Sequence, residues 1–131
     1  MEVNFLAVLV AAFAAFIVGG IWYSPKVFGN LWGKYSDMQK TKAGYRHKPV
    51  VFIVSFIFYF VSAWAFAILI GPDASLILAL YAGAAIGILF VAMCFGINYL
   101  FSGRSVMLLL IDGAYHIIQF LIYGLVLGLW H

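Results

Sequence analysis

The stretch LLLIDGAYHIIQFLIYGLVLGLW, residues 108–130, has the length of a membrane-spanning helix, yet it contains an acid, a histidine and a glutamine. A helix of about 20 predominantly apolar residues crosses roughly 30 Å of hydrocarbon. Over the whole chain of 131 residues, 67% are hydrophobic and 8% are charged, and the mean hydropathy is +1.14. Such a chain has too little polar surface to be soluble alone. The sequence therefore predicts an integral membrane protein.

Uncharged stretches divide the chain into four predicted spans, at about 3–22, 50–70, 74–101 and 106–130. Pro49 suits the first position of the second helix, because the missing N–H of proline costs nothing there. Gly71 ends that helix, and Asp73 is expected to cap the third. We expect an all-α membrane protein, a single domain of residues 1–131 with four transmembrane helices in a compact bundle. The third helix is long enough to require a tilt or a kink, with candidate weak points at Gly83, Gly87 and Gly96.

The basic residues indicate an orientation, because short cytoplasmic loops retain Lys and Arg. All seven fall in two predicted loops: Lys26, Lys34, Lys40, Lys42, Arg46 and Lys48 in the loop at 23–49, and Arg104 between the third and fourth helices. We therefore predict a multi-pass protein of the inner (cytoplasmic) membrane with both termini outside. The net charge of +3 is explained better by topology and by attraction to an anionic lipid bilayer than by binding to nucleic acid.

Aromatic residues gather directly after the first predicted helix, in WYSPKVFGNLWGKY, residues 22–35. Amphipathic rings of this kind suit the headgroup level of a membrane. Two interpretations follow from this pattern. One is an aromatic belt with a short interfacial helix at about 25–35, and the other is a lid over a site at the cytoplasmic end of the bundle.

Two motif blocks stand far apart in the chain. The first comprises Trp22, Tyr23, Ser24, Pro25, Phe28, Gly29 and Trp32, and the second comprises Phe101, Gly103, Arg104 and LIDGAYH at 110–116. With these blocks the chain resembles, over essentially its whole length, the uncharacterised bacterial family called domain of unknown function seventeen sixty-one. The resemblance implies a small four-helix integral membrane protein, and it brings no reaction, substrate or catalytic residue. In the family pattern position 112 is commonly Asn, position 105 is commonly Pro, and a Trp that this chain lacks stands near 87–93.

A polar stripe follows one face of the last predicted helix, since Asp112, His116, Gln119 and Tyr123 are spaced i, i+4, i+7 and i+11. A charged side chain deep in a bilayer costs at least about 2.5 to 3.5 kcal/mol, so the stripe should face protein or water. It is either a proton-responsive or substrate-lining surface, or a set of interhelical hydrogen bonds worth about 1 kcal/mol each. Candidate hydrogen-bond partners for the stripe on the other helices are Asn98, Tyr99, Ser55, Tyr59, Ser62 and Asn4. We include Asn98 in the possible substrate or proton site.

Small residues recur every four positions and favour close helix packing, either within the chain or between copies of it. These residues are Ala7, Ala11, Ala15 and Gly19 in the first helix, Ala79, Gly83 and Gly87 in the third, and Gly124 and Gly128 in the fourth.

The sequence distinguishes only weakly between an enzyme, a transporter and a non-catalytic membrane protein. No nucleophile–base set, phosphate-binding loop or metal-ligand cluster occurs, so we expect no enzyme, no cofactor and no metal site. One hypothesis is a homo-oligomeric transporter or channel for a small solute or ion, because four spans rarely enclose a path alone. The alternative is a non-catalytic membrane scaffold or partner subunit whose polar stripe only fixes helix packing.

Overall fold

The computed structural model describes residues 3–36, 40–41, 44–45 and 47–130. Four helical spans are long and apolar enough to cross a membrane. They are α1 (Phe5–Trp22), α3 (Pro49–Ile70), a third span formed by α4 (Leu76–Ala85), the π-helical segment η1 (Ile86–Ala92) and α5 (Met93–Ser102), and α6 (Val106–Leu129). The prediction of an all-α membrane protein with four transmembrane helices is confirmed, and the observed bounds lie within a few residues of the expected ones.

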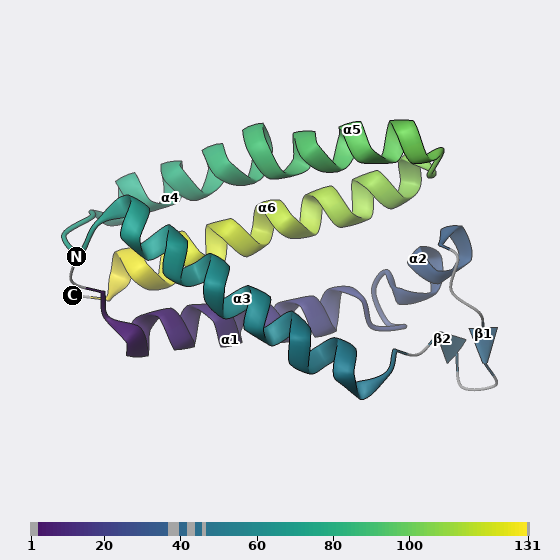
Figure 1. Cartoon of the computed structure of the whole chain (residues 1–131), viewed down its shortest axis with the longest axis horizontal. Coiled ribbons are helices and arrows are strands. Elements are labelled where there is room, and N and C mark those ends of the chain that lie inside the picture. The colour runs from purple at the N-terminus through teal and green to yellow at the C-terminus, as the bar shows by residue number, and fades with distance from the viewer. Residues whose placement is uncertain (1–2, 37–39, 42–43, 46, 131) are drawn as a thin grey trace.

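The predicted basic loop contains a short helix, α2 (Gly29–Tyr35), and an antiparallel strand pair, β1 (Lys40–Thr41) and β2 (Gly44–Tyr45). Lys40 pairs with Tyr45, and Thr41 pairs with Gly44. Figure 1 places these elements and the α5–α6 turn at one end of the bundle, whereas both ends of the chain and the α3–α4 turn lie at the other. The described part of the basic loop and the Arg104 turn therefore share one end.

Side-chain caps fix where the helices begin. The prediction that Asp73 caps the third helix is wrong, because Asp73 lies in a turn and the N-cap is Ser75, whose side chain accepts from the Leu78 amide at 3.1 Å. Ser105 caps α6 through the Met107 amide, also at 3.1 Å. A Ser at an N-cap satisfies one of the amides that a helix start leaves without a partner.

α6 is the central helix of the bundle and the most buried of the four spans, lying between α1 and the third span (Figure 1). Glycines allow α6 to approach the third span closely. A Cβ atom on Gly124 would overlap the Ala79 carbonyl, and one on Gly87 would lie 2.8 Å from the Ile117 Cα. The small-residue faces of the third and fourth helices are thus used within the chain. The third span contains the π-helical segment η1, which includes Gly87, and the tilt or kink expected in this span stays a prediction.

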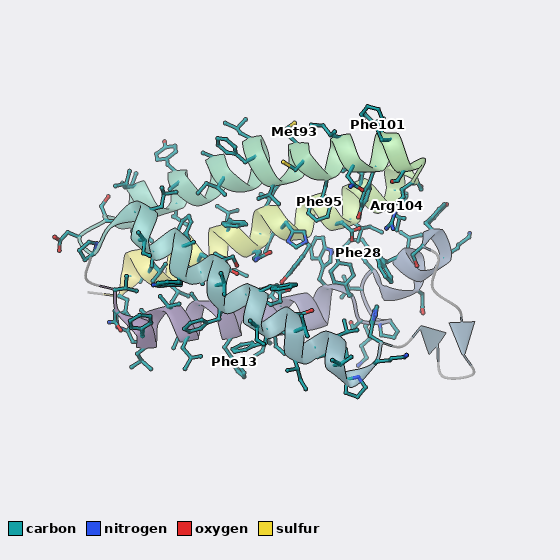
Figure 2. The ribbon with its side chains drawn as sticks, in the orientation of Figure 1. Phe13, Phe28, Met93, Phe95, Phe101 and Arg104 are labelled. Atoms are coloured by element: carbon teal, nitrogen blue, oxygen red, sulfur yellow. The ribbon has the colours of Figure 1, made fainter. Side chains whose placement is uncertain are left out.

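The outer faces of the helices carry large apolar side chains. Phe13, Met93 and Phe101 point away from the bundle in Figure 2, and Phe101 is 90% exposed. In a membrane-spanning bundle such side chains meet lipid. The buried interior instead lies where α1, α3 and α6 meet, with a core of Val8, Ala11, Ala12, Ala15, Ala63, Phe66 and Tyr123.

Candidate functional site

The polar stripe of α6 faces the inside of the bundle. Asp112 is 7% exposed, Gln119 is 6% exposed, and Tyr123 is fully buried. His116 is partly buried, with its ring stacked on Phe95 at 4.8 Å between centroids. Within the described ranges, every buried side-chain nitrogen and oxygen has a hydrogen-bond partner. The stripe is therefore packed against protein in this structure.

Asp112 joins three parts of the chain through its carboxylate. The Tyr23 hydroxyl, just after α1, donates to Oδ1 at 2.6 Å, and the Tyr99 hydroxyl of α5 donates to Oδ2. Next to it, the Trp22 indole Nε1 donates to the Ile111 carbonyl at 3.1 Å. Burial, and then the neighbouring Asp112 carboxylate, raises the pKa of the Tyr23 phenol well above its ordinary value, so Tyr23 stays a donor at neutral pH.

A tight turn directs Trp22 and Tyr23 inward. The Ser24 carbonyl accepts from the Gly29 amide at 2.8 Å, and a Cβ atom on Gly29 would overlap the Tyr23 carbonyl and lie 2.7 Å from the Ser24 carbonyl carbon. Phe28 packs its ring 4.7 Å from the Trp22 ring. Only glycine fits at position 29. Because residues 24–28 form this turn, the interfacial helix begins at Gly29 and not, as predicted, at about residue 25.

The remaining residues of the first motif lie on the outside of this turn. Pro25 is exposed, and Trp32 on α2 is partly buried with its ring 5.8 Å from Tyr23 in an edge-to-face arrangement. The ring of His47 lies 5.6 Å from Trp32. α2 thus covers the Tyr23 side of the bundle end, as a lid would, while Trp22 and Tyr23 hold the turn onto α6.

A second group of hydrogen bonds connects α6 to α3. The Gln119 amide Nε2 donates to the Tyr123 hydroxyl at 2.7 Å, so its Oε1 accepts from His116 Nδ1 at 2.5 Å. The Tyr123 hydroxyl donates to the Tyr59 carbonyl at 3.1 Å and lies 2.8 Å from Ser62 Oγ. This arrangement assigns the Nδ1 proton of His116 through the amide orientation.

Tyr115 belongs to the same network, although the sequence analysis did not single it out. Its hydroxyl donates to the Ala15 carbonyl at 2.7 Å and lies 2.5 Å from the Tyr59 hydroxyl, which must then be the donor of that pair. A Cβ atom on Gly19 would lie 2.6 Å from the Tyr115 oxygen, so Gly19 provides the space for this contact. The network consequently reaches α1 as well as α3.

Two expected partners of the stripe lie elsewhere. Asn98 is exposed on α5 beside Cys94, away from the buried stripe, and Asn4 caps α1 by accepting from the Ala7 amide at 3.1 Å.

Arg104 lies next to this site. Its guanidinium is 5.5 Å from the centre of the ring of Tyr99, the residue whose hydroxyl donates to Asp112. In the described ranges, no three His, Cys, Asp or Glu residues lie together as metal ligands would.

Both motif blocks fall within the range that a protein-family model matches, residues 6–128. The chain belongs to the family described as "Protein of unknown function (DUF1761)". Searches of curated proteins and of solved structures find no match. Family membership confirms the resemblance of the sequence, and the Tyr23–Asp112 and Trp22–Ile111 contacts supply a physical reason for the two motif blocks of this DUF1761 chain.

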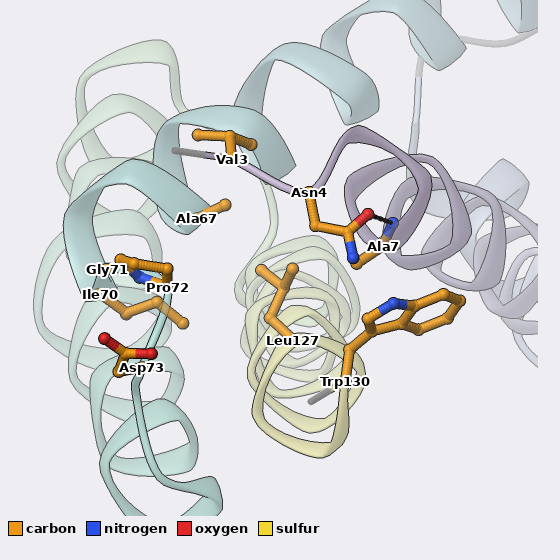
Figure 3. A pocket seen from close by; sticks show the side chains of 10 residues that line it. All are labelled: Val3, Asn4, Ala7, Ala67, Ile70, Gly71, Pro72, Asp73, Leu127 and Trp130. Carbon is orange, nitrogen blue, oxygen red and sulfur yellow. Dashed lines mark hydrogen bonds between the residues drawn. The ribbon is translucent and has the colours of Figure 1, made fainter. Parts of the chain in front are cut away.

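Two cavities lie at opposite ends of this DUF1761 protein. One, of about 460 Å³, lies at the end that carries the termini, where Asn4, Asp73 and Trp130 surround it (Figure 3). The other is a cleft of about 630 Å³ between α1 and α3 at the end with the basic loop. Its lining includes Phe16, Gly20, Tyr23, Phe52, Ser55 and Tyr59. Tyr59 is therefore both a wall of this cleft and a member of the buried network.

Proposed function

We propose that this DUF1761 protein is a non-catalytic membrane scaffold or partner subunit, in which the polar stripe fixes how the helices pack. One observation supports this most strongly: the buried side chains of the stripe are already hydrogen-bonded within the chain, Asp112 to two tyrosines and Gln119 to His116 and Tyr123. A conduction path needs such groups to be open to water or to a solute. Buried and satisfied polar groups instead specify one packing arrangement.

The test is flux through the full chain reconstituted in liposomes. Proton and K⁺ flux driven by a gradient should equal that of protein-free liposomes, and Asp112→Leu should lower the thermal stability of the purified protein. Gradient-driven flux in the parent that a folded Asp112→Asn variant loses would contradict the scaffold proposal and favour transport.

A homo-oligomeric transporter or channel for a small solute or ion is the second candidate. The observation in its favour is that Tyr59 belongs to two features at once. It lines the α1–α3 cleft, and its hydroxyl bonds to Tyr115 in the buried network. A solute in the cleft would meet the network there. Tyr59→Phe should then change any measured flux or its pH dependence, whereas a flux-free parent protein would remove this candidate.

We infer, further, that the basic end faces the cytoplasm of the inner membrane and that both termini lie outside. The positive-inside rule supports this orientation, because the elements that carry the described basic residues Lys26, Lys34, Lys48 and Arg104 lie at one end of the bundle. In a Cys94→Ser background, Lys26→Cys should react with an impermeant thiol reagent only from the cytoplasmic side. Asp73→Cys, also exposed, should react only from outside. The reverse labelling would reject the orientation.

Self-association or docking to another membrane subunit is part of the same proposal. The exposed apolar side chains of α3 and α5 leave ample surface for a neighbouring helix. The mass of the purified protein in a mild detergent, measured by light scattering with the detergent subtracted, tests self-association. A monomeric mass at all protein concentrations would leave a different subunit as the partner.

A further inference from the structure

The α1–α3 cleft differs from the groove between α5 and α6 in what surrounds it. Its walls are the rings of Phe16, Phe52 and Tyr59, with Phe16 set edge-to-face against Phe52 at 6.5 Å and against Tyr59 at 5.8 Å. Its floor includes Gly19 and Gly20 of α1. The groove between α5 and α6, in contrast, is lined by apolar residues alone, such as Gly96 and Leu109. The first cleft combines apolar walls with hydroxyl groups.

We propose that this cleft binds one anionic phospholipid, with an acyl chain between α1 and α3 and the phosphate at the basic end of the bundle. This inference does not depend on whether the protein is a scaffold or a transporter. A binding site for an individual lipid is a different property from general contact with a bilayer.

Charge at the mouth of the cleft favours an anionic headgroup. His47 lines the mouth, and Lys48 follows it directly, exposed and with its side chain making no capping bond to α3. The N-terminus of α3 begins here at Pro49 and contributes the positive end of its helix dipole. No acidic residue is among those lining the cleft in the described part of the chain. Basic pockets between transmembrane helices on the cytoplasmic side are known to hold anionic headgroups.

The depth of the cleft fits one leaflet. Its lining on α3 extends from Val51 to Tyr59, about 12 Å along a helix that rises 1.5 Å per residue. This is less than half of the roughly 30 Å hydrocarbon thickness. Ser55 lies between these two residues and makes no hydrogen bond to any residue that the structure describes, so its hydroxyl is available to donate to a glycerol or ester oxygen. The cleft can therefore hold the upper part of one lipid molecule.

Gly20 keeps this cleft open. A Cβ atom built on Gly20 meets no atom within 4 Å, unlike one on Gly19, which would collide with Tyr115. Glycine inside a helix is less favourable than alanine by roughly 0.5–1 kcal/mol, and here no packing contact requires it. A side chain added at position 20 therefore has open space at its Cβ atom, next to the cleft that Gly20 lines. Gly20→Leu is therefore the variant that fills the site.

The experiment is native mass spectrometry of the full chain, released from detergent that contains equimolar phosphatidylglycerol and phosphatidylcholine. The parent protein should retain one phosphatidylglycerol in preference to phosphatidylcholine. Gly20→Leu should lose this retained lipid, and Lys48→Gln should reduce the preference about fivefold, the contribution of one Lys near an anionic surface. Gly96→Leu is the matched control, because it fills the α5–α6 groove, where only Leu109 comes within 4 Å of the new Cβ, and should leave retention unchanged.

Equal retention of the two lipids by the parent protein would overturn the proposal, and so would unchanged retention by a folded Gly20→Leu variant. If Gly20→Leu does not fold, Lys48→Gln decides the matter, since an unchanged preference contradicts a phosphate at this mouth. Ser55→Cys, in a Cys94→Ser background in liposomes, should resist a charged thiol reagent. Rapid labelling there would mean that water, and not lipid, fills the cleft.

Discussion

The Tyr23 hydroxyl donates to Asp112 Oδ1 at 2.6 Å, although the two residues stand 89 positions apart in the chain. The neighbouring residues repeat the connection, since Trp22 donates to the carbonyl of Ile111. Two sequence motifs are thereby held together at one end of the bundle. With Tyr99 bonded to the other carboxylate oxygen, α5 is fastened to the same point.

Tyr23→Phe removes one donor to Asp112 and leaves a buried carboxylate oxygen with one partner fewer. The free energy of unfolding should fall by about 1–3 kcal/mol. Tyr35→Phe on α2 is the matched control, because Tyr35 is 42% exposed, and its stability should stay within about 0.5 kcal/mol of the parent. Thermal unfolding in detergent, followed by circular dichroism, measures both. Equal effects of the two substitutions would contradict the role given to Tyr23.

The raised pKa of Tyr23 predicts a loss of stability in alkali. A phenol whose pKa is higher in the folded than in the unfolded protein contributes stability that is fully present below the unfolded pKa of about 10. That contribution is lost as the pH rises further. Unfolding free energies measured between pH 8 and about 11 should therefore converge for the parent and Tyr23→Phe. A difference that stays constant over this range would show that Tyr23 titrates normally.

Replacements at Asp112 should separate hydrogen bonding from charge. Asn retains one acceptor oxygen and adds donors, so one tyrosine can keep its bond while the other turns to accept. Leu leaves both tyrosine hydroxyls without this partner. Asp112→Leu should thus cost about 2–4 kcal/mol, and Asp112→Asn roughly half of that. An Asn variant as unstable as the Leu variant would indicate that the negative charge itself is required.

Close packing of α6 against α4 predicts a strong effect of one methyl group. Gly124→Ala would place a Cβ atom against the Ala79 carbonyl and should destabilise the protein by about 1–3 kcal/mol. Gly20→Ala, also within a helix but facing open space, should be neutral or slightly stabilising. Melting temperatures of the two variants compare them directly. A harmless Gly124→Ala would mean that the two helices can separate at little cost.

The predictable part of this structure is the part that depends on local sequence. Long apolar runs define the four spans, and the helical period places Asp112, Gln119 and Tyr123 on one buried face. Tyr115 follows Asp112 by three positions and falls on the same face, so extending the stripe by one residue would have included it.

Other features depend on contacts that local patterns do not contain. Tyr23 reaches Asp112 only because the turn at Ser24 and Gly29 redirects the chain. Asn98 and Tyr99 are both predicted partners of the stripe, yet Asn98 is exposed, whereas Tyr99 points inward and bonds to Asp112. The π-helical segment η1 lies before these residues, and a wider turn changes the face on which later side chains lie. A regular helical period cannot anticipate that change.

A double-mutant cycle at Tyr23 and Asp112 tests most directly whether the polar residues hold this bundle together. Unfolding free energies are measured for the parent, Tyr23→Phe, Asp112→Leu and the double variant under the same detergent conditions. Residues in direct contact give interaction energies of about 0.5–3 kcal/mol, and we predict a favourable value in this range. The double variant should then be less destabilised than the sum of the two single variants. Additive effects would contradict the account, because they would mean that the Tyr23–Asp112 contact contributes nothing to the fold.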